Sequence, residues 1–128
     1  MKSIGFFGLC HDSTVAKQVL LRNCGKMQIE NSCEILGYLR EGKIKGMIMG
    51  FVPDLLSESK IRIPASILTD GEWCWTEDLI YYVEKYNLRL SEEFVRHMKK
   101  NEWKVPMVDV KVKTEFEYTQ TPADFGMT

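Results

Sequence analysis

The segment Thr69–Asp78, with the sequence TDGEWCWTED, contains four carboxylates, one thiol and two tryptophans within ten positions. Asp70 and Gly71 predict a tight turn, because glycine adopts positive φ without strain and an aspartate side chain can accept a hydrogen bond from the backbone two residues on. Residues 72–75 predict a short extended segment with both tryptophans on the same side. Thr76 then predicts the N-cap of a helix. The segment therefore predicts a turn, a strand and a helix start in succession.

Apolar residues at helical spacing predict four helices along the chain. The helix after Thr76 carries two carboxylates in its first turn, where they meet the positive end of the helix dipole. Asn31 and Ser91 are expected to cap two other helices with their side chains, and Gly42 is expected to end one of them in the left-handed conformation. The predicted helices span residues 13–23, 32–41, 77–86 and 92–100.

Period-2 alternation predicts the strands, and it is most regular in residues 108–118, where apolar residues or threonine alternate with charged ones. A strand with one charged face suits an antiparallel or edge position. Strands are expected near residues 44–52, 66–75 and 108–118, and a short buried strand is expected within residues 4–9. The predicted fold class is α+β, with a mainly antiparallel sheet and three or four packed helices.

The chain has 128 residues, of which 45% are hydrophobic and 27% charged, and its net charge is −1. This length and composition indicate one domain, over residues 1–118, followed by a flexible tail over residues 119–128. The small net charge gives no overall attraction to nucleic acid or to an anionic membrane. The apolar run near the start is too short for a secretion signal and no long apolar run follows, so a cytoplasmic location is expected.

No known catalytic motif is present, and the four cysteines have irregular spacing, so neither a metal site nor a disulfide framework is predicted. Cys10, His11 and Asp12 adjoin one another, but catalytic groups are assembled in space and sequence neighbours seldom face each other productively. His97 is expected to lie on the solvated side of its helix. The sequence thus predicts no catalytic residue, no metal and no cofactor.

Residues 65–94 contain seven carboxylates against only Lys85 and Arg89, an excess of five negative charges. Turn and capping roles are available for most of these carboxylates. The excess also indicates a docking surface for a basic partner, which neighbouring aromatic side chains would anchor. The residues expected to bind a partner are Asp70, Glu72, Trp73, Trp75, Glu77, Asp78 and Tyr81.

Residues 67–106 resemble a group of small bacterial immunity proteins from toxin-immunity systems, including those of contact-dependent growth inhibition. The resemblance rests on the order of TDG, a tryptophan pair, DL-x-YYVEKY and EEF-x-x-HM. Members of this group often have proline at the positions of Thr76 and Ser91, and both residues here keep the character of a helix start. Immunity proteins span many folds, so the resemblance implies a role more than a structure.

The resemblance implies a cytoplasmic protein that binds a cognate toxin domain, commonly a nuclease, and blocks it without catalysis of its own. Neither a membrane nor direct contact with nucleic acid is expected. Two other functions stay open at the level of sequence. One is a small cytosolic enzyme that uses Cys10 and His11 or the carboxylates near Asp70, and the other is a regulatory interaction domain that has no toxin.

Overall fold

The computed structural model describes residues 2–9, 13–27, 31–57 and 60–107 and contains a single α+β domain, as the sequence predicts. The predicted strand at residues 108–118 and the tail at 119–128 lie outside the described residues. The elements in chain order are β1 (Lys2–Ile4), the short 3₁₀ helix η1 (Phe7–Leu9), α1 (Ser13–Asn23), α2 (Ser32–Arg40), β2 (Lys43–Pro53), β3 (Arg62–Thr69), β4 (Trp73–Thr76), α3 (Glu77–Tyr86) and α4 (Glu92–Lys100).

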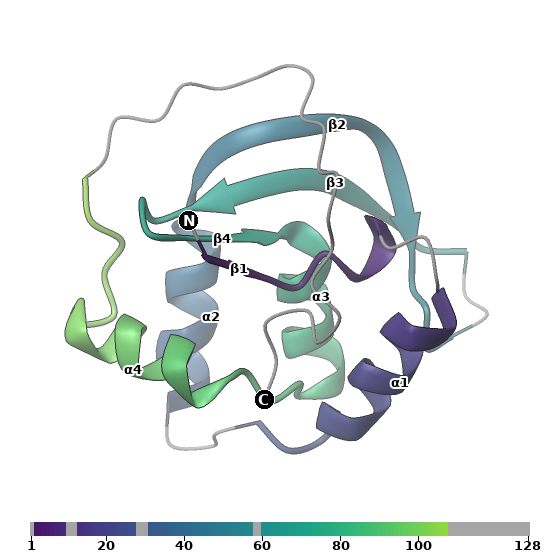
Figure 1. The fold of residues 1–128 in the computed structure, drawn as a ribbon, viewed down its shortest axis with the longest axis horizontal. Coiled ribbons are helices and arrows are strands. Elements are labelled where there is room, and N and C mark those ends of the chain that lie inside the picture. The colour runs from purple at the N-terminus through teal and green to yellow at the C-terminus, as the bar shows by residue number, and fades with distance from the viewer. Residues whose placement is uncertain (1, 10–12, 28–30, 58–59, 108–128) are drawn as a thin grey trace.

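The described strands form one sheet in the order β1-β4-β3-β2. β3 pairs antiparallel with both β2 and β4, whereas β1 pairs parallel with β4. Figure 1 shows α2, α3 and α4 gathered on one side of this sheet and α1 beside η1. The sheet is thus mainly antiparallel in the part that the structure describes.

The four predicted helices are confirmed, with α2 one residue shorter than expected. The strand expected near residues 66–75 is divided by the predicted turn into β3 and β4, where Gly71 has φ +99°. The strand expected within residues 4–9 is wrong for most of that range. The chain leaves the extended conformation after Ile4, because Gly5 and Phe6 both have positive φ, and η1 follows.

Trp75 is the largest fully buried side chain of the core, which lies between the sheet and the helices. Its ring lies 6.0 Å from that of Tyr38 and 5.6 Å from that of Phe94, so residues of α2 and α4 meet on it. Its indole Nε1 donates to the carbonyl oxygen of Leu39 at 3.0 Å, which satisfies an acceptor in the last turn of α2. Burial of Trp75 therefore fixes α2 and α4 against β4.

The capping predictions are confirmed for Ser91, whose hydroxyl accepts from the backbone N–H of Phe94 at 3.3 Å. They are wrong for Asn31 and Thr76, whose side chains make no capping hydrogen bond. The Thr76 hydroxyl instead accepts from the backbone N–H of Phe6 at 3.0 Å and donates to Asp78. A long-range contact with the segment after β1 thus takes the place of the local cap.

Gly42 does not have the positive φ expected of a left-handed helix end. Its importance is close packing, since a Cβ atom there would lie 2.6 Å from a ring carbon of Trp75 and 3.0 Å from the Cβ of Leu68. Real Cβ atoms do not approach neighbours this closely. The glycine therefore lets the chain between α2 and β2 pass over the buried indole.

We expect Gly42→Ala to lower the free energy of unfolding by about 1–3 kcal/mol, because the added methyl group overpacks the contact with Trp75. Gly37→Ala is the matched control: Gly37 lies inside α2 and a Cβ there meets nothing within 4 Å. Its helix propensity alone should raise the free energy of unfolding by about 0.5–1 kcal/mol. Urea denaturation measures both changes, and equal effects of the two variants would contradict the role of Gly42.

Candidate functional site

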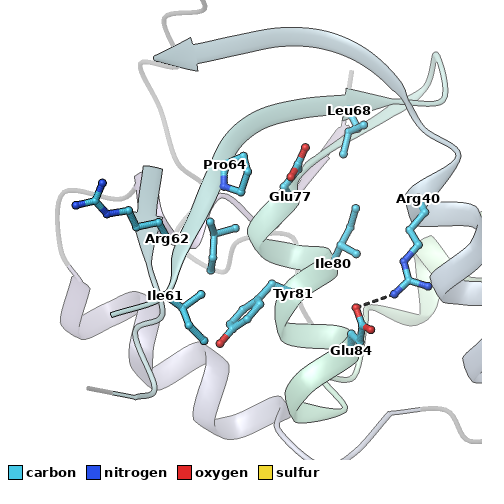
Figure 2. A pocket seen from close by; sticks show the side chains of 10 residues that line it. Arg40, Ile61, Arg62, Pro64, Leu68, Glu77, Ile80, Tyr81 and Glu84 are labelled. Atoms are coloured by element: carbon cyan, nitrogen blue, oxygen red, sulfur yellow. Dashed lines mark ion pairs between the residues drawn. The ribbon is translucent and has the colours of Figure 1, made fainter. Parts of the chain in front are cut away.

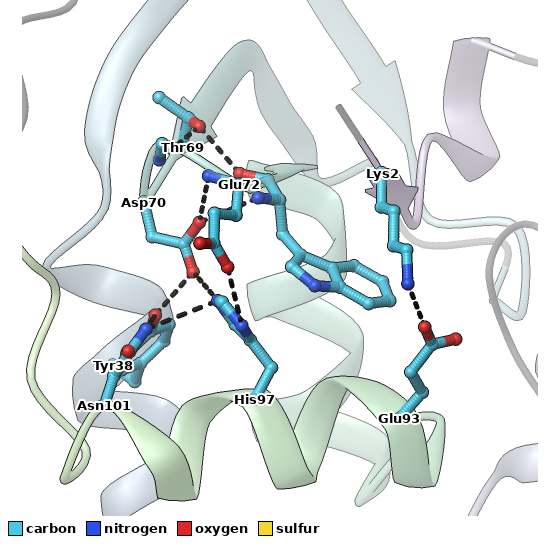
Figure 3. Close-up of polar contacts among 10 residues, drawn as sticks. Lys2, Tyr38, Thr69, Asp70, Glu72, Glu93, His97 and Asn101 are labelled. Atoms are coloured by element: carbon cyan, nitrogen blue, oxygen red, sulfur yellow. Dashed lines mark hydrogen bonds and ion pairs between the residues drawn. The ribbon is translucent and has the colours of Figure 1, made fainter.

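The carboxylate of Asp70 is buried and accepts hydrogen bonds from three parts of the fold (Figure 3). Its Oδ1 accepts from the backbone N–H groups of Glu72 at 2.9 Å and Trp73 at 2.8 Å, which closes the turn between β3 and β4. Its Oδ2 contacts the hydroxyl of Tyr38 on α2 at 2.5 Å and the Nε2 of His97 on α4 at 2.7 Å. The predicted turn role of Asp70 is confirmed, and the residue also connects the hairpin to two helices.

These contacts decide the protonation state of Asp70. Burial by itself would raise the pKa of this carboxyl, but the hydrogen bonds from Tyr38, from two backbone amides and from His97 outweigh it and hold the pKa below its ordinary value. Conversely, burial and the hydrogen bond to Asp70 raise the pKa of Tyr38. Asp70 is therefore a buried anion at neutral pH, and Tyr38 stays a neutral donor.

His97 lies between two carboxylates, and its side chain is only 11% exposed. Its Nε2 faces Asp70, and its Nδ1 lies 3.2 Å from Oε2 of Glu72, whose side chain is 77% exposed. The expectation that His97 is solvated is wrong, because the hairpin turn covers that face of α4. Its place three residues after the inward-facing Phe94 was the one signal in the sequence that pointed to burial.

The residues expected to bind a partner do not form one surface. Asp70, Trp73, Trp75 and Asp78 are each at most 5% exposed, so these four residues are not accessible to a partner. Asp78 turns inward because its Oδ2 accepts from the backbone N–H of Gly8 at 2.8 Å, and its burial raises the pKa of the carboxyl. Of the predicted set, only Glu72, Glu77 and Tyr81 reach solvent, and they belong to separate regions of the surface.

Three further carboxylates of the acidic segment are exposed and paired with cations. Glu84 on α3 lies 2.6 Å from Arg40 of α2, and Glu92 lies 2.8 Å from Arg89. Glu93 forms an ion pair with Lys2 at the start of β1. Arg40 and Lys2, which lie outside residues 65–94, thus offset two of the five excess negative charges of that segment, and Arg89 pairs within it.

Comparison with protein-family models, with curated proteins and with solved structures gives no match. Within residues 2–9, 13–27, 31–57 and 60–107, no helix has the length and apolar character needed to cross a membrane. The same described residues contain no cluster of three or more His, Cys, Asp or Glu side chains arranged to hold a metal ion. Cys10 and His11, on which one of the alternative functions depends, lie outside them.

Glu77 and Tyr81 line a groove of about 410 Å³ between α3 and β3. Figure 2 shows Ile80 and Tyr81 of α3 opposite Pro64 of β3 and the preceding Ile61, with the Arg40–Glu84 ion pair at one side. Burial raises the pKa of the Glu77 carboxyl, although a hydrogen bond with Ser66 acts against it. The groove therefore has apolar walls and charged margins.

A neighbouring hollow of about 500 Å³ shares Ile61 and Arg62 with this groove and adds Phe51 of β2. Phe51 and Ile61 are 60% and 40% exposed, and both line this hollow. We call the continuous region formed by Phe51, Ile61, Arg62, Pro64 and Tyr81 the Ile61 surface. It is the candidate contact site for a macromolecule, because exposed apolar patches of this kind mark interaction sites.

Tyr81 is held rigidly at the edge of this surface. Its hydroxyl donates to Oδ2 of the buried Asp54 at 2.6 Å, and that oxygen also accepts from Tyr86 at 2.6 Å. The ammonium of Lys85 lies 5.4 Å from the centre of the Tyr81 ring. An aromatic side chain already fixed in this way loses little conformational freedom when a partner binds.

The Asp70→Asn variant separates the two roles of this carboxylate. An asparagine keeps the oxygen that accepts from the turn amides but replaces Oδ2 by an NH₂ group, which cannot accept from Tyr38 or His97. We expect the free energy of unfolding at pH 7 to fall by about 1.5–3 kcal/mol. Asp70→Ala should cost more, because the turn amides also lose their acceptor, whereas the exposed Glu34→Gln should stay within about 0.5 kcal/mol of wild type in urea denaturation.

The lowered pKa of Asp70 also predicts a pH dependence. A depressed folded-state pKa contributes stability above the unfolded value of about 3.9, and this contribution is lost as the pH falls through the folded pKa. The loss of unfolding free energy between about pH 5 and pH 2 should therefore be larger for wild type than for Asp70→Asn. Identical acid profiles of the two proteins would contradict an ionised Asp70 in the folded state.

Proposed function

We propose that this protein is a cytoplasmic immunity protein that binds a cognate toxin domain and neutralises it. The resemblance of residues 67–106 to small bacterial immunity proteins supports this role. That segment runs from the end of β3 through α4 and supplies Trp75, Asp70 and Tyr81, which organise the core and one edge of the Ile61 surface. The role requires binding and no catalysis, so the candidate site is a contact surface.

The observation that carries the proposal is the exposure of Phe51 and Ile61 beside the fixed ring of Tyr81. Interfaces derive most of their affinity from a few large apolar or aromatic side chains that a partner covers completely. Burial of each such side chain contributes about 1.5–3 kcal/mol. Of the residues that the sequence predicts to bind a partner, the proposed contact site keeps Tyr81. The buried carboxylates and tryptophans are replaced by residues of β2, of β3 and of the segment just before β3.

The charges around the Ile61 surface indicate the chemistry of the partner. Lys60 and Arg62 border the hollow beside Phe51, so the facing surface of the toxin is expected to be apolar with carboxylates at its margin. A nuclease domain fits, because nucleases that hold metal ions do so through carboxylates in the active site. This argument replaces attraction between an acidic surface and a basic nuclease, since Asp70 and Asp78 are buried and Glu84, Glu92 and Glu93 are paired with cations.

We expect Phe51→Asp and Ile61→Asp each to weaken toxin binding by at least about 30-fold, which corresponds to about 2 kcal/mol. Leu21→Asp is the matched control, because Leu21 on α1 is 57% exposed and lies outside the Ile61 surface. The binding partner is the toxic domain encoded directly upstream of this gene. Calorimetric titration measures the affinity, and survival of cells that express the toxin measures protection.

Circular dichroism controls for folding of all three variants. If the folded Phe51→Asp and Ile61→Asp proteins bind and protect as well as Leu21→Asp, the toxin contacts another surface. If no toxin gene lies upstream and no toxin domain binds, the proposal is wrong and a regulatory interaction domain without a toxin is favoured.

A further inference from the structure

A separate cavity of about 810 Å³ lies at the end of the β3–β4 hairpin, and none of the residues that line it belongs to the Ile61 surface. Its charged lining comes from three parts of the chain. β1 contributes Lys2, the hairpin turn contributes Glu72, and α4 contributes Glu93, Arg96, His97 and Lys100. The cavity is large enough for a small molecule, since ligand sites typically have about 300–1,000 Å³.

The cations in this cavity are unevenly paired. Lys2 forms an ion pair with Glu93 and lies 5.5 Å from the centre of the Trp73 ring, so both charges of that pair are satisfied. Arg96 and Lys100 are four residues apart on one face of α4, and their side chains make no hydrogen bond or ion pair with any described part of the chain. Two cations that have no partner within residues 2–9, 13–27, 31–57 and 60–107 therefore line the same cavity.

His97 follows Arg96 on α4, lines the same cavity and is oriented by a buried group. Asp70 holds Nε2 at 2.7 Å, which leaves Nδ1 as the nitrogen on the cavity side. A neutral imidazole carries a proton on only one nitrogen, so contact of both nitrogens with carboxylates is fully satisfied only in the protonated ring. Nδ1 of His97 is therefore the ring position that an anion in the cavity would meet.

Glu72 supplies the anion that contacts Nδ1, but it holds this position weakly. Its side chain is 77% exposed and extends from a turn that contains the positive-φ residue Gly71. An ion pair with so exposed a carboxylate contributes only about 0–1 kcal/mol. Another oxyanion could therefore displace the Glu72 carboxylate from Nδ1 of His97.

We propose that this cavity is a binding site for an oxyanion, a phosphate or carboxylate group of a small ligand. The oxyanion accepts from Nδ1 of His97, displaces Glu72 and is held between Arg96 and Lys100. Guanidinium groups bind such oxyanions through two parallel hydrogen bonds. The site is independent of the toxin-binding surface, so it does not rest on the proposed function.

The test follows the imidazole nitrogen resonances of His97 by NMR during titration with inorganic phosphate at pH 6 and constant ionic strength. We expect a saturable shift in wild type. Glu72→Gln removes the internal competitor and should tighten binding by about two- to fivefold, in line with the small free energy of an exposed ion pair. The double variant Arg96→Gln, Lys100→Gln should weaken binding by about tenfold or more, because it loses hydrogen bonds between charged groups.

A double variant on α1, Lys17→Gln with Arg22→Gln, changes the net charge equally and should leave phosphate binding as in wild type. A parallel titration with acetate distinguishes the two sources of the oxyanion, since the group that saturates at lower concentration is the better ligand. All substituted side chains are exposed, so the fold should survive. A shift that does not saturate, or one that is equal in all variants, would overturn the proposal.

Discussion

The buried negative charge of Asp70 is the constraint on which the arrangement of the other elements depends. A carboxylate that has lost its water must receive several hydrogen bonds, and here the donors come from the hairpin turn, from Tyr38 of α2 and from His97 of α4. The hairpin, α2 and α4 must therefore meet at one point. Asn101, the residue that follows α4, donates a further hydrogen bond to the Tyr38 hydroxyl at 3.0 Å, so the C-terminal end of this helix is also joined to α2.

Aromatic side chains next to Asp70 also pack the hairpin against α2 and α4. The ring of Trp73 lies 4.7 Å from that of Phe94, and Trp75 contacts both Phe94 and Tyr38. The two tryptophans of β4 are thus the contact between the sheet and the helices, and they cannot act as exposed anchors for a partner. A second buried carboxylate, Asp54, repeats the same principle near β2, where it accepts from the hydroxyls of Tyr81 and Tyr86.

Each of these buried carboxylates orients one side chain of a candidate site. Asp54 fixes Tyr81 at the edge of the apolar Ile61 surface, and Asp70 orients His97 toward the cationic cavity. The surfaces differ in chemistry because their exposed residues differ: Phe51 and Ile61 offer apolar area, whereas Arg96 and Lys100 offer positive charge. In both places a hydrogen bond to a buried carboxylate holds a side chain that reaches the surface in one orientation.

The sequence alone determined the single α+β domain, the bounds of the helices and the turn at Asp70, because apolar spacing, Ser91 as a cap and the positive φ of Gly71 are local properties. Only the tertiary structure decided which charged residues reach solvent. The partners of Asp70 lie 27 and 32 residues away, Arg40 meets Glu84 across two helices, and Lys2 meets Glu93 from the other end of the chain. A local pattern shows that a side chain is charged, but its burial and its pairing depend on which distant surfaces pack against it. For that reason the acidic segment around Asp70 has the composition of a docking site in the sequence, whereas in the fold Asp70 and Asp78 are interior residues.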